Sequence, residues 1–541
     1  MFIILALFMA GNGWAQGADM VITGARINTL DERMPAASAL AVKDGRIVYV
    51  GDDAGATAGP RTRHIDARGA TIVPGLIDSH VHMQALGDEL ETFDLRNAKS
   101  VAEAVGVVKN ETARHKPGEW IRGRGWDQTN WGGRFPSADD LAAAAPANPV
   151  YLSRVDGHAA WVNRQALALA GITAETPDPP GGRIVRTAAG EPSGVLIDRA
   201  MALAERRIPP PTPGEIRRRI ARAARECARF GLTTVHDAGI TEGELDAYRD
   251  LIAHGELPVR VYAMIGGAGD LWRQYLQRGP EIGERLTVRA IKLIADGALG
   301  SRGAALLAPY SDDPGNSGLM MLARDQIQEA AREAKAHGFQ VATHAIGDRA
   351  NRTVLEAYGA ALGGANGLRF RIEHAQVVAP ADFELFRKYS IVASIQTTHA
   401  TSDMRWAEAR LGPERVKGAY AWRRFLELGV AVANGSDVPV ESPNPLAGFY
   451  AAITRQDRNG EPAAGWFPEQ RMTREEALRS WTLGGAYTAF EEGSKGSLAV
   501  GKLADFVMLS EDIMSAPPRE ILNTRVTMTV VGGEVVYSET R

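Results

Sequence analysis

Two histidines, His80 and His82, follow a short apolar segment and are separated by one residue. Residues two apart in a β-strand lie on the same face, so both imidazoles would point to one side of the chain. Neutral imidazole is a common zinc ligand. Taken alone, the pair is equally compatible with two ordinary core histidines, so a metal site requires further ligands.

Three more side chains of the ligand type end segments that have strand character. His344, His374 and Asp437 close the segments Gln340–His344, Arg369–His374 and Val430–Asp437. Barrel enzymes carry functional side chains at the carboxyl ends of their strands. Four of the eleven histidines fall at such ends, which is more than scattered placement would give. Together these residues indicate a divalent metal held by histidine and aspartate.

Lys292 lies inside another apolar segment, on the face opposite its neighbours Ile291 and Leu293. A buried ammonium group is costly, and it would repel a nearby dication. Carboxylation by carbon dioxide would turn the side chain into a carbamate, an anionic ligand whose two oxygens can bridge two metals. An ion pair with Asp296 is the other explanation, and the residues alone leave both open.

These ligands require strands whose ends meet, and the middle of the chain provides them. Between residues 74 and 494, strand-like segments alternate with helical patterns, which is typical of a parallel sheet. Eight such units predict an α/β fold, a (β/α)8 TIM-type barrel. The expected strands are Gly75–His80, Leu232–Asp237, Val259–Met264, Ala290–Asp296, Gln340–His344, Arg369–His374, Ile391–Ile395 and Val430–Asp437.

The two ends of the chain and one long insertion complete the expected organisation. Residues 19–73 and 495–541 have strand patterns, and we expect them to form one small β-sandwich, with a hairpin turn at Asp44–Gly45. About 150 residues separate the first two barrel strands, too many for one crossover. We therefore expect residues 94–215 to form a lid-like subdomain inserted after the first strand.

Six motifs in this chain have a familiar combined pattern. They are Pro74–His82, Ile291–Ser301, Thr343–Asp348, Arg371–Gln376, Gly435–Pro439 and Gly496–Asp505. Together they resemble the amidohydrolase superfamily, and within it the family-3 branch that includes N-substituted formamide deformylases. The resemblance runs from about residue 19 to the end of the chain.

The resemblance implies a role for each matched residue. His80 and His82, with Asp437, would bind the more buried metal, whereas His344 and His374 would bind a second one. Carboxylated Lys292 would bridge the two. A metal-activated water would be the nucleophile, and Asp437 would take its proton. The implied cofactors are one or two divalent ions, with zinc expected, and carbon dioxide for Lys292.

The implied activity is hydrolysis of a carbon–nitrogen bond of the amide or N-formyl type, other than a peptide bond, in a small molecule. The same metals could serve an esterase, a lactonase or a deaminase. A non-catalytic exported binding protein is a further alternative, and the complete ligand set argues against it. Candidate pocket residues, for which a structural role is equally compatible, are Trp126, Asp156, His158, Asp296 and Arg302.

Two further histidines lie near expected strand ends. Asp237, next to His236, could hydrogen-bond a metal-binding histidine, and a satisfied core pair explains these two residues equally well. His399 follows the seventh expected strand, and the sequence leaves its role open.

Composition limits partners and location. A net charge of -4 without a basic face argues against nucleic acid. The single cysteine, Cys227, excludes an internal disulfide and a cysteine-rich zinc site.

The apolar run Met1–Ala10 is too short to span a membrane, and small residues follow it, so residues 1–18 are expected to be a signal peptide for a periplasmic or secreted protein. A buried N-terminal strand would instead leave the protein in the cytoplasm. No other segment predicts a membrane span, and a homo-oligomer is compatible with the sequence.

Overall fold

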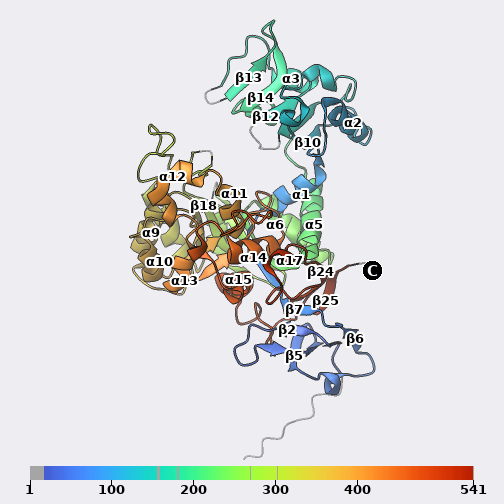
Figure 1. The fold of residues 1–541 in the computed structure, drawn as a ribbon, viewed down its shortest axis with the longest axis vertical. Coiled ribbons are helices and arrows are strands. Elements are labelled where there is room, and N and C mark those ends of the chain that lie inside the picture. The colour runs from blue at the N-terminus through green and yellow to red at the C-terminus, as the bar shows by residue number, and fades with distance from the viewer. Residues whose placement is uncertain (1–16, 155–158, 180–181, 268–269, 301, 540–541) are drawn as a thin grey trace, which may run out of the picture. The chain divides into compact units, whose positions relative to one another are not determined.

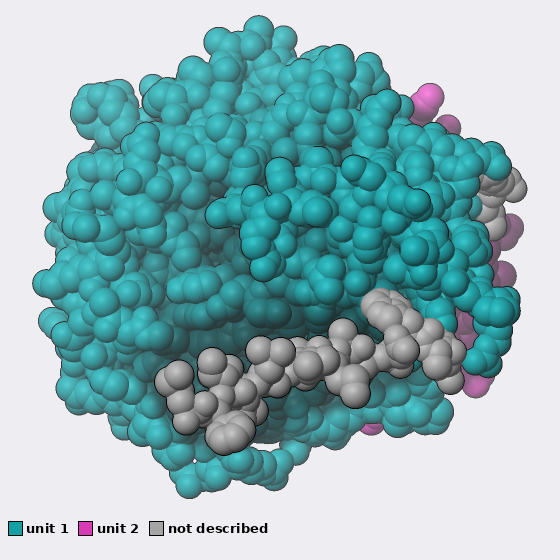
Figure 2. Space-filling model, turned by 90° about the horizontal axis from the view of Figure 1, so that it is seen from below, with its two compact units in different colours: residues 1–86, 220–541 teal, residues 87–219 magenta. Residues whose placement is uncertain are grey.

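The computed structural model describes residues 17–154, 159–179, 182–267, 270–300 and 302–539. It divides into two compact units, one formed by Met1–Leu86 with Ile220–Arg541 and the other by Gly87–Arg219, which Figure 2 colours separately. Most of the expected signal peptide lies outside the described residues, as do Asp156 and His158. None of the described helices has the length and apolar character that a membrane crossing requires.

The first unit contains the predicted barrel, of which Figure 1 labels strand β18 and several helices. Its strands are the eight that the sequence predicts. Their bounds are β8 Leu76–Val81, β15 Leu232–Ile240, β16 Arg260–Gly266, β18 Leu286–Ile294, β19 Gln340–Ala345, β20 Arg371–His374, β21 Val392–Ile395 and β22 Val432–Asn434. Neighbouring strands pair in parallel in this order. A parallel bridge between Val81 and Val438 nearly closes the ring, which confirms the (β/α)8 fold.

The last barrel strand is shorter than predicted. Strand β22 ends at Asn434, whereas the sequence pattern continues to Asp437. Asp437 has a φ of 57°, a left-handed conformation outside the β region of extended strands. Asp437 therefore lies in the loop after the strand, and the loop conformation decides where its carboxylate points.

Helices follow the strands and cover the outside of the barrel. They include α5 Pro213–Arg229, α6 Glu242–Ala253, α7 Leu271–Arg278, α8 Arg324–Ala336, α9 Asp348–Leu362, α10 Phe383–Tyr389, α11 Thr397–Asp403, α12 Ala407–Arg415, α13 Trp422–Glu427, α14 Pro445–Thr454, α15 Arg474–Ser480 and α16 Leu483–Thr488. Helix α8 shows why such segments form helices here. Its buried residues Ile327, Ala330, Ala331 and Ala334 recur every three or four positions and form one apolar stripe.

Both ends of the chain join in two sheets that share one core. One sheet has the order β5-β4-β1-β6 and the other β25-β24-β23-β7-β2-β3. Their bounds are β1 Met20–Thr23, β2 Arg26–Asn28, β3 Ala36–Ala37, β4 Ala39–Lys43, β5 Arg46–Gly51, β6 Arg63–Asp66, β7 Thr71–Pro74, β23 Phe506–Leu509, β24 Val526–Val531 and β25 Glu534–Ser538. Ile22, Leu40, Ile72 and Phe506 pack in the core between the sheets. Strand β7 pairs with β23, so segments from the two ends meet directly.

The second unit has its own sheet, in the order β13-β14-β12-β11-β10-β9. Its strands are β9 Phe93–Asp94, β10 Ile121–Trp126, β11 Val150–Arg154, β12 Ala159–Val162, β13 Gly182–Arg186 and β14 Pro192–Asp198, with helices α2 Val101–Thr112, α3 Arg164–Ala170 and α4 Met201–Glu205. Trp126 is fully buried in the core of this unit, and its ring centroid lies 6.4 Å from that of Trp161. Trp126, a candidate pocket residue, is enclosed in this core, and its indole N–H donates to the Leu152 carbonyl.

Candidate metal centre

Asp437 lies between two groups of histidines, and its two oxygens face different groups. On one side, Oδ1 is 3.5 Å from His80 Nε2 and 3.3 Å from His82 Nε2. Two ligands of one tetrahedral zinc ion, each at about 2.0–2.2 Å from the metal, lie about 3.3–3.6 Å apart. His80, His82 and Asp437 are thus spaced as ligands of a single ion.

On the other side, Asp437 faces His374 and His399. Oδ2 of Asp437 lies 3.8 Å from His399 Nε2. The rings of His374 and His399 are nearly parallel, at an angle of 11° and a centroid distance of 6.0 Å. One ligand atom from each of these three residues lies within 4.8 Å of the others. The carboxylate of Asp437 therefore belongs to two possible metal-binding groups.

The loop that carries Asp437 is tied to the end of β8. The N–H of Asp437 donates to the His80 carbonyl at 2.8 Å. The carboxylate of Asp78 accepts the N–H groups of His80 and Ser436, at 3.1 and 2.9 Å, and the Ser436 hydroxyl. Burial raises the pKa of Asp78 to about 7. Asp78 thereby holds the two strand ends, and hence His80 and Asp437, at a defined separation.

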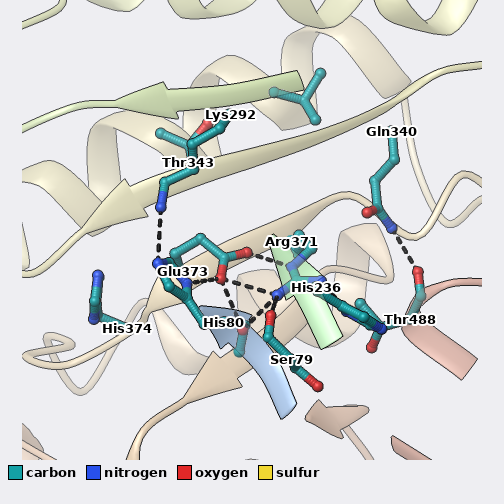
Figure 3. A network of polar contacts seen from close by, with 12 residues as sticks. Ser79, His80, His236, Lys292, Gln340, Thr343, Arg371, Glu373, His374 and Thr488 are labelled. Atoms are coloured by element: carbon teal, nitrogen blue, oxygen red, sulfur yellow. Dashed lines mark hydrogen bonds and ion pairs between the residues drawn. The ribbon is translucent and has the colours of Figure 1, made fainter. Parts of the chain in front are cut away.

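A buried network of charged residues on the Nδ1 side of His80 orients its ring (Figure 3). Its Nδ1 is hydrogen-bonded to Glu373, which also pairs with Arg371 and accepts the Ser394 hydroxyl at 2.9 Å. Burial alone would raise the pKa of Glu373, but the charge of Arg371 and the hydrogen bond from His80 hold it well below its usual value. The Glu373 anion thus keeps the proton of His80 on Nδ1 and leaves Nε2 free for a metal.

Glu373 is a functional residue that the sequence analysis missed, although it lies inside the quoted motif Arg371–Gln376. Its signal was present: Arg371 and Glu373 are two apart in one strand, so they share a face. Two opposite charges on a buried strand face must find partners. The sequence did not reveal that the third partner would be His80, from a strand 293 residues away.

Lys292 reaches the same centre. Its Nζ lies 3.0 Å from His80 Nε2 (Figure 3), and burial lowers its pKa to about 8. Asp296, the alternative partner, instead accepts backbone N–H groups from three residues, Ala305, Ile346 and Gly347, at 2.8–3.0 Å. Asp296 therefore holds together the loops after β18 and β19, and Lys292 points to the metal ligands.

The remaining predicted ligand, His344, lies at the same end of the barrel. Its ring centroid is 4.5 Å from that of His374, and its Nε2 is 3.6 Å from Asp296 Oδ1. Burial lowers the pKa of His344 to about 3 and that of His80 to about 4, and it lowers the pKa of His374 well below the usual range. These imidazoles are neutral at pH 7, the state in which histidine binds metals. Neutral imidazoles around an anionic carboxylate fit a divalent cation.

Comparison with known proteins agrees with this centre. A family model described as "Amidohydrolase family" matches residues 63–537. The chain belongs to the amidohydrolase family. The resemblance predicted from the motifs is thus confirmed, and the protein is a hydrolase of the metal-dependent amidohydrolase superfamily.

Relatives of this amidohydrolase match it over nearly its whole length. Protein LONG AFTER FAR-RED 3 of Arabidopsis thaliana is 37% identical over 537 residues, which cover 96% of this chain and 92% of that protein. N-substituted formamide deformylase of Arthrobacter pascens is 28% identical, with 97% and 99% covered. The crystal structure of an uncharacterized metal-dependent hydrolase from Pyrococcus horikoshii matches with a TM-score of 0.77 and 28% identity, covering 92% of this chain and 99% of that chain.

The structure shows the contacts of two further candidate residues, Arg302 and Asp237. Arg302 pairs with Asp312 through two hydrogen bonds, at 3.1 and 2.9 Å, and so stabilises the loop after β18. Asp237 accepts the Met83 N–H at 3.1 Å and the Tyr248 hydroxyl at 2.6 Å. Of the two explanations that the sequence left open for Asp237, these contacts favour a satisfied core residue, because each of its oxygens accepts one of these donors. It thereby positions the backbone next to His82.

A cavity of about 620 Å³ opens beside Lys292, at the ends of β15, β16 and β18. Its walls include apolar side chains from Trp272, Leu293, Ile294, Met321 and Leu322. Gly239, Gly266 and Gly267 also line this cavity and add no side chains to it. Ligand sites are concave and mostly apolar with a few polar groups, and this cavity fits that description.

Proposed function

We propose that this amidohydrolase cleaves a carbon–nitrogen bond of the amide or N-formyl type in a small molecule. The observation that carries the proposal is the position of Asp437, whose two oxygens face two separate groups of histidines. The similarity to N-substituted formamide deformylase over almost the full length of both chains favours this bond type. The nitrogen-rich donor set favours zinc as the metal.

A bound divalent metal would supply an acidified water and would polarise a carbonyl group. Asp437 would accept the proton of the water. Burial would raise the pKa of this carboxyl, but the imidazoles of His80 and His82 keep it well below its usual value, so the acceptor is anionic. Asp437 would then deliver the proton to the departing amine. The apolar cavity beside Lys292 would hold the substituent of the substrate.

Lys292 would serve as a carbamate. Its lowered pKa leaves part of the side chain as the neutral amine at neutral pH, and only that form attacks carbon dioxide. The new N–C bond forms as the amine nitrogen loses one proton to solvent, which gives an anion with two oxygens. That anion would replace an unfavourable ammonium group 3.0 Å from His80 Nε2.

The test is a matched substrate panel with the full chain, purified and assayed for metal by plasma emission spectrometry. A formamide, an acetamide, an ester, a lactone and a cyclic amidine should carry the same apolar substituent. We expect the formamide or the amide to give the highest kcat/KM, with activity lost on chelation and restored by zinc. Preference for the ester, lactone or amidine would overturn the proposed bond type, and metal-independent turnover would overturn the metal's role.

A further inference from the structure

His399 stands out among the polar side chains of the barrel that no predicted role includes. It lies on α11, the helix that follows β21, and only 8% of its surface is exposed. Its Nε2 has no hydrogen-bond partner among the described residues. A buried polar nitrogen without a partner costs about 1–3 kcal/mol. Such an atom, placed beside metal ligands, indicates that its partner is a bound group.

We propose that His399 is a metal ligand, which binds the second ion together with His374 and Asp437. The inference rests on the proposed metal-dependent hydrolysis and adds a ligand to the six that the motifs imply. The distance of 3.8 Å between His399 Nε2 and Asp437 Oδ2 is too long for a hydrogen bond. It is close to the about 3.3–3.6 Å expected between two ligands of one tetrahedral zinc ion.

The neighbouring contacts leave the required atoms free. Nδ1 of His374 is hydrogen-bonded to Gln396 Oε1 at 2.7 Å, so the other nitrogen, Nε2, is available to a metal. The rings of His374 and His399 are nearly parallel, and one ligand atom from each lies within 4.8 Å of the other and of an Asp437 oxygen. Oδ1 of Asp437 faces His80 and His82, so Oδ2 is the oxygen that can bind an ion of this second group.

The helix that carries His399 is held by the strands that carry the other ligands. The Thr397 N–H donates to Asn434 Oδ1 at 3.3 Å, and its hydroxyl donates to the Gly448 carbonyl at 2.7 Å. Asn434 is the last residue of β22, and Gly435 N donates to Ile395 O at 2.9 Å. The start of α11 is thereby tied to the strand end that leads into Asp437. Such support is what a preorganised ligand needs.

The experiment measures metal binding rather than activity alone. Wild type, His399→Ala, His399→Gln and His374→Ala are equilibrated in zinc buffers and analysed by plasma mass spectrometry. His254→Ala is the matched control, because the His254 side chain is 59% exposed and follows the last residue of α6, outside the two ligand groups. The visible absorption of the cobalt-substituted proteins reports the coordination of each ion. Far-ultraviolet circular dichroism checks folding, and His399→Gln keeps a neutral polar side chain in case the alanine variant does not fold.

We expect wild type and His254→Ala to bind two ions per chain. His399→Ala and His374→Ala should each weaken the second ion by at least about tenfold, the lower end of the loss seen when a partner of a ligand is removed. The cobalt spectrum should change in both. A folded His399 variant that keeps both ions within about threefold of wild-type affinity, with an unchanged spectrum, would overturn the proposal.

Loss of kcat/KM with intact metal binding would also overturn the proposal, since it would make His399 a substrate contact. So would a wild-type protein that binds a single ion. Failure of the proposed amide chemistry is distinguishable, because metal stoichiometry does not depend on which substrate is cleaved.

Discussion

The carboxylate of Glu373 is hydrogen-bonded to Nδ1 of His80, and both side chains are fully buried. His80 is the second-last residue of β8, and Glu373 lies in β20, a strand that does not pair with β8 in the barrel. This contact decides which nitrogen of His80 faces Asp437 and Lys292. The anion that orients the ligand is itself held by Arg371 and Ser394.

Glu373→Gln should weaken metal binding by about 10–100-fold, because the amide no longer fixes the proton of His80 on Nδ1. It should also destabilise the fold, since breaking a buried pair costs about 3–5 kcal/mol and leaves Arg371 uncompensated. Zinc titration and denaturant unfolding measure the two effects. Ser394→Ala is the matched control, because it removes one hydrogen bond to the same carboxylate and should cost about 1 kcal/mol. Wild-type zinc affinity in Glu373→Gln would contradict the orienting role.

Asp437→Asn should leave the fold intact and remove most turnover. Proton transfer by a positioned side chain typically contributes about 10²–10⁴-fold, and the weaker metal ligand adds to the loss. Steady-state kinetics with zinc in excess separate the two contributions. If the variant kept more than about a tenth of wild-type kcat/KM, well short of this loss, Asp437 would not be the proton acceptor.

Lys292→Ala should abolish activity, and short carboxylic acids with bicarbonate should restore part of it by supplying the missing two-oxygen ligand. Lys292→Arg serves as the control, because a guanidinium neither reacts with carbon dioxide nor binds a cation. In the wild type, ¹³C-bicarbonate should give a carbamate signal by nuclear magnetic resonance. An unmodified lysine in a fully active, fully metallated enzyme would rule the carbamate out.

Met321→Ala and Ile294→Ala should alter substrate choice more than metal content. Both side chains line the cavity beside Lys292, and they are 60% and 47% exposed, so neither is needed for the core. Losing apolar contact area should raise KM several-fold for substrates with bulky apolar substituents, and less for small ones. Val500→Ala is the control, because this exposed residue follows Leu498 of the sandwich core. Equal losses for all substrates would show that the cavity does not hold the substituent.

Trp126→Ala should destabilise the unit formed by Gly87–Arg219 rather than change specificity directly. The indole is fully buried, stacks near Trp131 and donates to the Leu152 carbonyl. Truncating a buried tryptophan costs about 3–5 kcal/mol. Thermal and denaturant unfolding measure the effect, and Leu169→Ala, on the exposed side of α3, should be close to neutral. If the Trp126→Ala protein had wild-type stability and an altered substrate ranking, Trp126 would instead be a pocket residue.

The sequence by itself determined the barrel and most of its candidate metal ligands. Strand patterns depend on local alternation and on short apolar runs, so all eight strands could be predicted without knowing their neighbours. His80, His374 and Lys292 were recognisable for the same reason, since each lies in or at the end of such a strand. The family followed from motifs that occupy these same strand ends.

Only the tertiary structure decided which side chains meet across the barrel. Glu373 orients His80, and His399 joins His374 beside Asp437, because strands far apart in the chain bring their ends to one face. The contacts of Trp126 and Asp237 were equally hidden in the sequence. The Trp126 indole donates to the Leu152 carbonyl, and Asp237 accepts the Met83 N–H and the Tyr248 hydroxyl. Contacts of this kind depend on loop conformations, such as the left-handed φ of Asp437, and the strand pattern that predicts the fold carries no information about them.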